Sequence, residues 1–197
     1  MKTILTYAFL FFSTYALTAQ TASISGKVTD LEGNSLPGIN LQLLDESGAV
    51  VASANNVNEY IFTDIPTGKD YTLQVSKAGS PLNGLSTFDV VLMHKHILGT
   101  GNLSNPYQIL AGDVNGSSTV SVADIIEMRL VILGVIPEFR NGKNWGFLPA
   151  AYAFQNPSNP FTETANISNT FTLNDDISGF DYIGYKYGDL NGTYVPE

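Results

Sequence analysis

Residues 21–78 alternate polar and apolar side chains between turn signals, and this pattern constrains the fold more than any other feature of the chain. Period-2 segments such as "SISGKVTD", "INLQLLD" and "YTLQVSK" are separated by breaks rich in Gly, Pro and Asn. Successive side chains of a strand point to opposite faces, so each segment can bury one face. The pattern predicts an antiparallel β-sandwich with a core of Ile24, Val28, Ile39, Leu41, Leu43, Tyr60, Phe62, Tyr71, Leu73 and Val75.

The runs "GKVTDLEGNSLPGINLQL" and "NEYIFTDIPTGKDYTL" resemble the carboxypeptidase-regulatory-like and Cna-B-like sandwich family over nearly all of this segment. The resemblance implies an immunoglobulin-like or prealbumin-like sandwich that acts as a spacer, stalk or adhesive support. Some relatives carry an isopeptide crosslink from a lysine to an Asn or Asp. Lys27 lies in the first predicted strand, but "YTLQVSK" offers no Asn or Asp, so we expect Lys27 on a solvated strand face.

Residues 86–99 repeat in residues 121–134, without a gap and with six identities in fourteen positions. Such a repeat indicates a duplicated structural unit. Each copy has apolar residues at helical spacing and a glycine at its end. The repeat therefore predicts two helices that bury their apolar stripes against each other, with Val90, Met93 and Ile97 on the first and Ile125, Met128 and Ile132 on the second.

The stretch before the second helix offers oxygen atoms at alternate positions. Counted from Asp113, these residues fall at positions 1, 3, 5, 7, 9 and 12, from which an EF-hand loop coordinates Ca²⁺. Hard oxygen ligands without His or Cys favour Ca²⁺ over a transition metal. The sequence predicts a calcium site formed by Asp113, Asn115, Ser117, Thr119, Ser121 and Asp124. The alternative is a metal-free turn that caps the helix at Asp124.

The motif "DVNG", with Asp124 and the trailing "ILG", resembles the dockerin family over residues 79–134. In dockerins, two loop-helix repeats bind calcium and dock to cohesin modules. The resemblance implies a cohesin-like partner domain, with positions 10 and 11 of each loop in contact with it. In this chain those positions are Thr87, Phe88, Val122 and Ala123.

The first repeat lacks the early half of its calcium loop, because Ala78, Ser80 and Leu82 stand where carboxylates and amides are needed. Near the end of the chain, "GDLNG" (188–192) repeats "GDVNG" (112–116) without a helix after it. We expect the two halves to pair in space as a second, split calcium site formed by Asn83, Ser86, Asp89, Asp189 and Asn191. The alternatives are a surface turn or the opening of a further repeat.

The N-terminus has the layout of a secretory signal peptide, with Lys2, an uncharged stretch and small residues near a cut after Ala19. The alternative is an uncleaved anchor. We therefore expect residues 1–19 to be removed and the protein to be secreted, extracellular or at the cell surface. The chain has no cysteine, so disulfides are excluded. Its formal net charge of −9 argues against nucleic acid as a partner.

Residues 137–197 are rich in Asn, Pro and aromatic residues and have no helical period. The sequence therefore predicts a multidomain fold: an all-β sandwich over 21–78, a small α-helical dockerin-like two-repeat unit over 79–136, and an irregular extension over 137–197 that packs on this unit. The aromatic side chains of the extension either cover that unit or stack on sugars; they are Trp145, Phe147, Tyr152 and Phe154.

We expect no catalysis, because the chain has no nucleophile elbow, His-Glu-x-x-His motif or glycine-rich phosphate loop. His94 and His96 are two residues apart on a helix and so point in different directions. The sequence predicts a secreted, calcium-binding protein-interaction module that docks to an extracellular or cell-surface partner. The alternatives are a structural stalk of a larger secreted protein and a carbohydrate-binding accessory protein.

Overall fold

The computed structural model describes residues 20–196; the signal-peptide prediction concerns residues 1–19, which lie outside the described residues. Five strands come first: β1 (Thr21–Thr29), β2 (Ile39–Asp45), β3 (Val50–Val57), β4 (Glu59–Pro66) and β5 (Lys69–Lys77). The helices α1 (Thr87–Ile97), α2 (Pro106–Gly112) and α3 (Val122–Ile132) follow. The chain then forms β6 (Trp145–Pro149), α4 (Phe161–Thr164), β7 (Thr170–Leu173) and β8 (Tyr182–Lys186).

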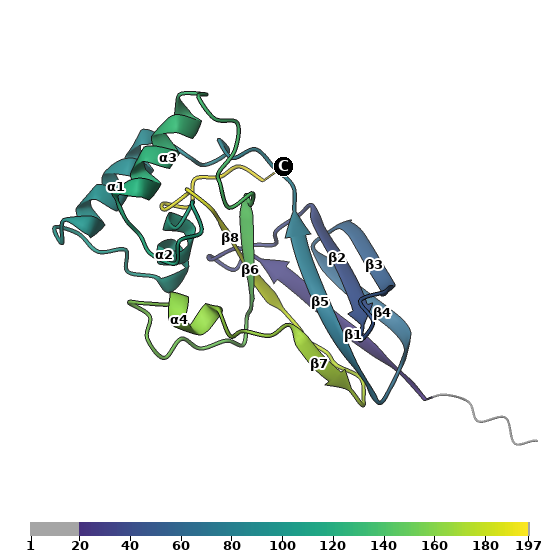
Figure 1. Ribbon diagram of the computed structural model, residues 1–197. Coiled ribbons are helices and arrows are strands. Elements are labelled where there is room, and N and C mark those ends of the chain that lie inside the picture. Colours follow the sequence, from purple (N-terminus) through teal and green to yellow (C-terminus); the bar gives the residue numbers. More distant parts are fainter. Residues whose placement is uncertain (1–19, 197) are drawn as a thin grey trace, which may run out of the picture.

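Two four-stranded sheets pack together, with strand orders β4-β1-β8-β6 and β3-β2-β5-β7. Among the strands named here, the pairings are antiparallel apart from that of β1 with β8, where Val28 faces Tyr182 and Thr29 faces Ile183. The inward-facing residues expected from the alternation of residues 21–78 are buried, and Val75 is half-buried. The helices α1 to α3 lie at one end of the molecule and strands β1 to β5 at the other, with β6 and β8 between them (Figure 1).

The predicted fold class is wrong in two respects. The C-terminal region is not an irregular extension, because β6, β7 and β8 complete both sheets. The helices do not form a two-repeat dockerin-like unit: α2 lies between α1 and α3 in the chain, and all four helices are short. Two eleven-residue helices bury too little apolar surface by themselves, and their core also contains Leu148, Tyr185 and Leu190 from the C-terminal region.

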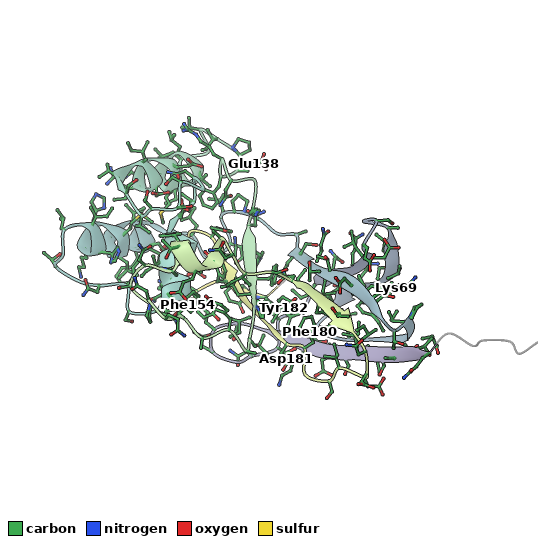
Figure 2. All side chains as sticks on the ribbon, turned by 60° about the horizontal axis from the view of Figure 1, so that its bottom comes forward. Lys69, Glu138, Phe154, Phe180, Asp181 and Tyr182 are labelled. Carbon is green, nitrogen blue, oxygen red and sulfur yellow. The ribbon has the colours of Figure 1, made fainter. Side chains whose placement is uncertain are left out.

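The strands β6 and β8 serve two cores at once. Trp145 and Tyr182 point into the sandwich core, whereas Leu148 and Tyr185 point into the helical core. Strands with two buried faces lack the polar-apolar alternation of half-buried strands, and "WGFLP" and "YIGYK" have no such alternation. Figure 2 shows Tyr182 and Phe180 in the middle of the molecule and Phe154 on the side of the helices. In the described part of the chain, no helix is long and apolar enough to cross a membrane.

A candidate metal centre formed by two matching loops

The contiguous loop, residues 113–124, joins the end of α2 to the start of α3. Its first carboxylate, Asp113, is buried, and the following residues of the loop surround it. The Oδ1 atom accepts a hydrogen bond from the backbone N–H of Ser117 at 2.8 Å, and Oδ2 accepts one from Ser118 at 2.7 Å. The tight turn places Ser118 in the left-handed region, at φ 61°. The early half of the loop therefore wraps its backbone amides around one carboxylate.

The second carboxylate of the contiguous loop, Asp124, belongs to a capping box at the start of α3. Its Oδ2 accepts a hydrogen bond from the backbone N–H of Ser121 at 2.9 Å, and its Oδ1 accepts one from Asn115 at 3.3 Å. Asp124 is 0% exposed. Burial raises its pKa above the usual value, the hydrogen bonds from Ser121 and Asn115 oppose this shift, and the charge of Asp113 adds to it. The two carboxylates thus converge in a desolvated place.

The split loop, residues 84–89 together with 189–194, has the same arrangement from two distant parts of the chain. Asp189 Oδ1 accepts a hydrogen bond from the backbone N–H of Thr193 at 3.1 Å, and Oδ2 accepts one from Tyr194 at 2.8 Å. These donors stand four and five residues after the carboxylate, as Ser117 and Ser118 do after Asp113. The "GDLNG" segment therefore forms the same turn as "GDVNG".

The helix side of the split loop also matches. Ser86 and Asp89 form a capping box at the start of α1, with Ser86 N–H donating to Asp89 Oδ2 at 2.8 Å. Asp89 Oδ1 accepts a hydrogen bond from the backbone N–H of Leu190 at 2.8 Å. This tail donor comes one residue earlier in its turn than Asn115 does in the contiguous loop. Asp89 is 0% exposed. The pKa of Asp189 is raised by burial, and the nearby charge of Asp89 raises it further.

One backbone carbonyl completes each loop. In the contiguous loop, the Ser117 hydroxyl donates to the carbonyl of Thr119 at 3.2 Å. In the split loop, the Thr193 hydroxyl donates to the carbonyl of Gly84 at 3.2 Å. Thr119 and Gly84 both stand two residues before the capping serine. A Cβ atom on residue 84 would lie 2.5 Å from Asp189 Oδ2, so only glycine allows this close approach.

The side-chain amide of Asn191 marks the point on which the split loop converges. In the orientation that satisfies the surrounding network, its nitrogen donates to Asp189 Oδ1 at 2.8 Å and to Asp89 Oδ1 at 3.2 Å. A donor that bridges two carboxylates occupies the place where a cation would lie. The structure therefore brings together Ser86, Asp89, Asp189 and Asn191 from the predicted split site.

Asn83 lies outside the split loop, because its amide makes two hydrogen bonds with the backbone of Val195, both at 2.8 Å. The sequence analysis missed two members of the loop, Thr193 and the carbonyl of Gly84. The repeat contains a signal for both. Thr193 stands at the fifth position of "DLNGT", and Gly84 corresponds to Thr119 at the offset of thirty-five residues.

The donor set of each loop fits a hard cation. Each loop contributes two carboxylates, an amide side chain, hydroxyls and one backbone carbonyl, the ligand types that Ca²⁺ prefers. Residues 20–196 contain no group of three or more His, Cys, Asp or Glu side chains that could hold a metal. Any cation here would therefore depend on neutral oxygen atoms for most of its coordination.

The residues expected to contact a partner lie at the first turns of α1 and α3. Thr87, Phe88, Val122 and Ala123 are all exposed. The N-terminal half of α1 lines a groove together with the end of α3 and its C-cap residue Leu133, so the two helices are antiparallel. The two pairs of residues therefore lie at opposite ends of the helix pair.

The aromatic residues of the C-terminal region pack on one another. Trp145 is buried, and its ring meets the edge of Tyr194 at 4.9 Å between centroids. Phe154 packs edge-on against Tyr107 and Tyr152, at 5.5 and 5.1 Å between ring centroids.

No protein-family model matches the chain, and a search of curated proteins finds no match.

Proposed function

We propose that the protein is a non-catalytic, calcium-binding interaction module of the extracellular space or the cell surface. The observation that supports it best is the match between the two loops. Each holds two buried carboxylates, and the backbone N–H groups four and five residues after the first carboxylate donate to it in both loops. Burial raises the pKa values of Asp124 and Asp189, and the repulsion between the two carboxylates of each loop raises them further. A divalent cation relieves this repulsion.

The proposed ligands of the contiguous loop are Asp113, Asn115, Ser117, Thr119 through its carbonyl, Ser121 and Asp124. Those of the split loop are Asp189, Asn191, Thr193, Gly84 through its carbonyl, Ser86 and Asp89. Asn191 would coordinate the cation through its amide oxygen, so its side chain would turn from the metal-free orientation described above. With two carboxylates each, the loops belong with extracellular modules that bind calcium at about 10⁻⁴ to 10⁻³ M. Calcium supplies charge neutralisation and a fixed geometry, and the chain's residues supply the surface that it fixes.

The surface proposed for docking is the outer face of α1 and α3. Val91 and Ile126 stand at equivalent positions of the repeat, as do Leu98 and Leu133, and all four are exposed. A groove of about 370 Å³ runs between the helices beside Val91 and Leu133. Val91 and Leu133 line this groove together, and an exposed apolar patch is typical of interaction sites. Because both helices begin in a calcium loop, calcium would fix the positions of Thr87, Phe88, Val122 and Ala123.

The partner that we propose is a cohesin-like protein domain, on the strength of the dockerin-like loop motif.

The contacts of the two histidines do not point to a catalytic function. His94 Nδ1 lies 2.8 Å from the carbonyl of Val90, and His96 Nδ1 accepts a hydrogen bond from the backbone N–H of Leu103 at 3.3 Å.

Calorimetric titration of the full chain with calcium tests the metal part of the proposal. We expect two calcium ions to bind, Asp124→Asn to remove one and Asp189→Asn to remove the other. Asp175→Asn is the matched control, because Asp175 is exposed and belongs to neither loop. The absence of heat at millimolar calcium, or an unchanged stoichiometry in both variants, contradicts the proposal.

The docking part is tested by isolating complexes from culture supernatant with calcium or with EDTA. We expect a cohesin-like domain to copurify in calcium only, and Val91→Asp with Ile126→Asp to abolish the complex without loss of calcium binding. A complex that survives EDTA contradicts the role of the metal.

A structural spacer is the second candidate. Its support is that β7 and β8 complete the sheets begun by residues 21–78, so the sandwich and the helices form one continuous body. A spacer would bind calcium for stability but would form no calcium-dependent complex. The isolation experiment therefore separates the two functions.

A further inference from the structure

The groove between α1 and α3 contains basic and polar groups beside its apolar ones. Val91 of α1 and Ile132 and Leu133 at the end of α3 give it apolar walls. His94 of α1 and Arg129 of α3 also line it, and they stand at equivalent positions of the thirty-five-residue repeat. The described residues that line this groove include no acid. The groove is therefore an apolar hollow with one nitrogen-bearing side chain from each helix.

The polar groups of the groove are open to a partner. Arg129 is exposed, and within residues 20–196 its side chain takes part in no ion pair and no hydrogen bond. Its guanidinium presents a planar fork of N–H donors that fits a carboxylate. His94 Nδ1 lies 2.8 Å from the carbonyl of Val90. Because a carbonyl only accepts, Nδ1 carries the proton of the neutral ring, and Nε2 is left as an acceptor.

The surface around the groove has the opposite sign to the chain as a whole, which has 18 acidic and 9 basic residues. Arg129 and Lys95 are exposed on the two helices. Glu127 is paired with Arg140 at 3.6 Å, and the other acids of this region belong to the calcium loops. All four acids between residues 85 and 136 are buried: Asp89, Asp113, Asp124 and Glu127. An apolar surface with exposed cations attracts an acidic partner.

We propose that the groove receives an acidic and apolar peptide segment of the partner, in which a glutamate or aspartate stands beside large apolar side chains. This inference rests on the proposed function and adds the chemistry of the partner. The carboxylate pairs with Arg129, and an apolar side chain lies between Val91 and Leu133. A backbone N–H of the segment donates to His94 Nε2. A basic segment would be repelled by Arg129 and Lys95, and a free fatty acid would leave the acceptor of His94 without a donor.

NMR titration of the calcium-loaded full chain with short peptides tests the proposal. We expect acetyl-Phe-Glu-Leu-amide to shift the signals of the groove residues and to bind with a Kd of roughly 1 mM. The matched peptide acetyl-Phe-Gln-Leu-amide should bind about tenfold more weakly, because a hydrogen bond between two charged groups is lost. Raising the salt should weaken only the glutamate peptide. Equal binding of the two peptides overturns the assignment of the carboxylate.

A double-mutant cycle assigns the carboxylate to its partner in the groove. We expect Arg129→Gln to remove the preference for the glutamate peptide. Lys69→Gln is the matched control, because it removes the same charge from β5, on the sandwich (Figure 2), and should leave the preference intact. A preference that survives in Arg129→Gln overturns the role of this residue. Decanoate that binds the groove as tightly as the glutamate peptide overturns the peptide and indicates a site for free apolar carboxylates.

The isolation of complexes separates this inference from the proposed function. Arg129→Gln should weaken the calcium-dependent complex about tenfold and reduce its dependence on salt. A complex that forms equally well with Arg129→Gln overturns the inference and leaves the proposed function intact. If the glutamate peptide binds the groove but no complex forms with the unaltered protein, the proposed function fails and the groove remains a site for acidic peptides.

Discussion

The contiguous loop and the split loop reach the same arrangement of oxygen atoms by two different routes. Residues 113–124 form theirs locally, as one turn between two helices. The split loop brings residues 189–194 back to residues 84–89 across about a hundred residues of chain. Closing so long a loop costs only logarithmically more than closing a short one. The contiguous loop depends only on residues that are close together in the sequence. The split loop forms only when the complete chain has folded.

Because it depends on the complete fold, the split loop also connects the helical region to the sandwich. Tyr194, whose backbone N–H bonds to Asp189, also donates its hydroxyl to Asp30 Oδ2 at 2.8 Å. Asp30 in turn holds the β1–β2 turn by accepting hydrogen bonds from Glu32 and Asn34. The Tyr194 side chain therefore connects the candidate metal site to the sandwich. Within residues 20–196, no such hydrogen bond joins the contiguous loop to the sandwich.

The largest difference between the loops is expected from the residue after each first aspartate. Leu190 and Val114 occupy the same position and are both buried in the helical core. We expect Leu190→Ala to cost about 2 to 5 kcal/mol in the free energy of unfolding, and Val114→Ala about 1 kcal/mol less, because it removes one carbon fewer. Urea denaturation measures both. A smaller loss of stability for Leu190→Ala than for Val114→Ala would mean that residues 189–194 contribute little to holding the fold together.

Calcium should stabilise the protein through both loops. At a hundredfold excess over Kd, each site adds about 2.7 kcal/mol to the free energy of unfolding. We expect Asp113→Asn and Asp189→Asn each to remove one of these contributions, as measured by thermal melting with and without calcium, and Asp175→Asn to remove neither. A full response to calcium in Asp189→Asn would restrict the metal to the contiguous loop.

Acid should have opposite effects on the metal-free and the calcium-bound protein. A raised pKa in the folded state means that the folded protein binds the proton more tightly than the unfolded chain. Without calcium, stability therefore rises as the pH falls from neutral through the raised pKa values of Asp124 and Asp189, until the unfolded value of 3.8 is reached. With calcium, protons compete with the cation and stability falls.

Urea denaturation at about pH 7 and pH 5, in EDTA and in calcium, measures both trends. Carboxyls with a lowered pKa, such as Asp30 and Asp176, act in the other direction, but only as the pH approaches their unfolded value of 3.8. The double variant Asp124→Asn, Asp189→Asn is the control, since the rise in EDTA should disappear in it. The metal-free protein could instead lose stability between pH 7 and pH 5, with the same loss in the double variant. That result would contradict the assignment of the pH dependence to Asp124 and Asp189.

The sequence predicts those parts of the structure that depend on local pattern. The strands of residues 21–78 follow from alternation, and the turn around Asp113 and the cap at Asp124 follow from spacing. The strands β6 and β8 could not be found in this way, because Trp145 and Leu148 face different cores and leave no polar side to the strand. The repeated "GDLNG" suggested its pairing with Asp89, but the contribution of Gly84 is a backbone carbonyl, which has no signature in the residue type.

The smallest expected effect concerns the connection through Tyr194. Tyr194→Phe keeps the ring on Trp145 and removes only the hydroxyl that donates to Asp30. One hydrogen bond to a partly buried carboxylate is worth about 1 to 3 kcal/mol when its partner is left unsatisfied. Asp30 keeps its hydrogen bonds from Glu32 and Asn34, so we expect a loss of stability at the lower end of this range.

If the split loop connects the sandwich to the helices, Tyr194→Phe should also slightly weaken the affinity for calcium at that loop. The affinity at the contiguous loop should stay unchanged. Calorimetry on Tyr194→Phe in the Asp124→Asn background isolates the split site, and in the Asp189→Asn background it isolates the contiguous one. An equal loss in both backgrounds would mean that the hydroxyl supports general stability and that the two loops do not differ in their dependence on the fold.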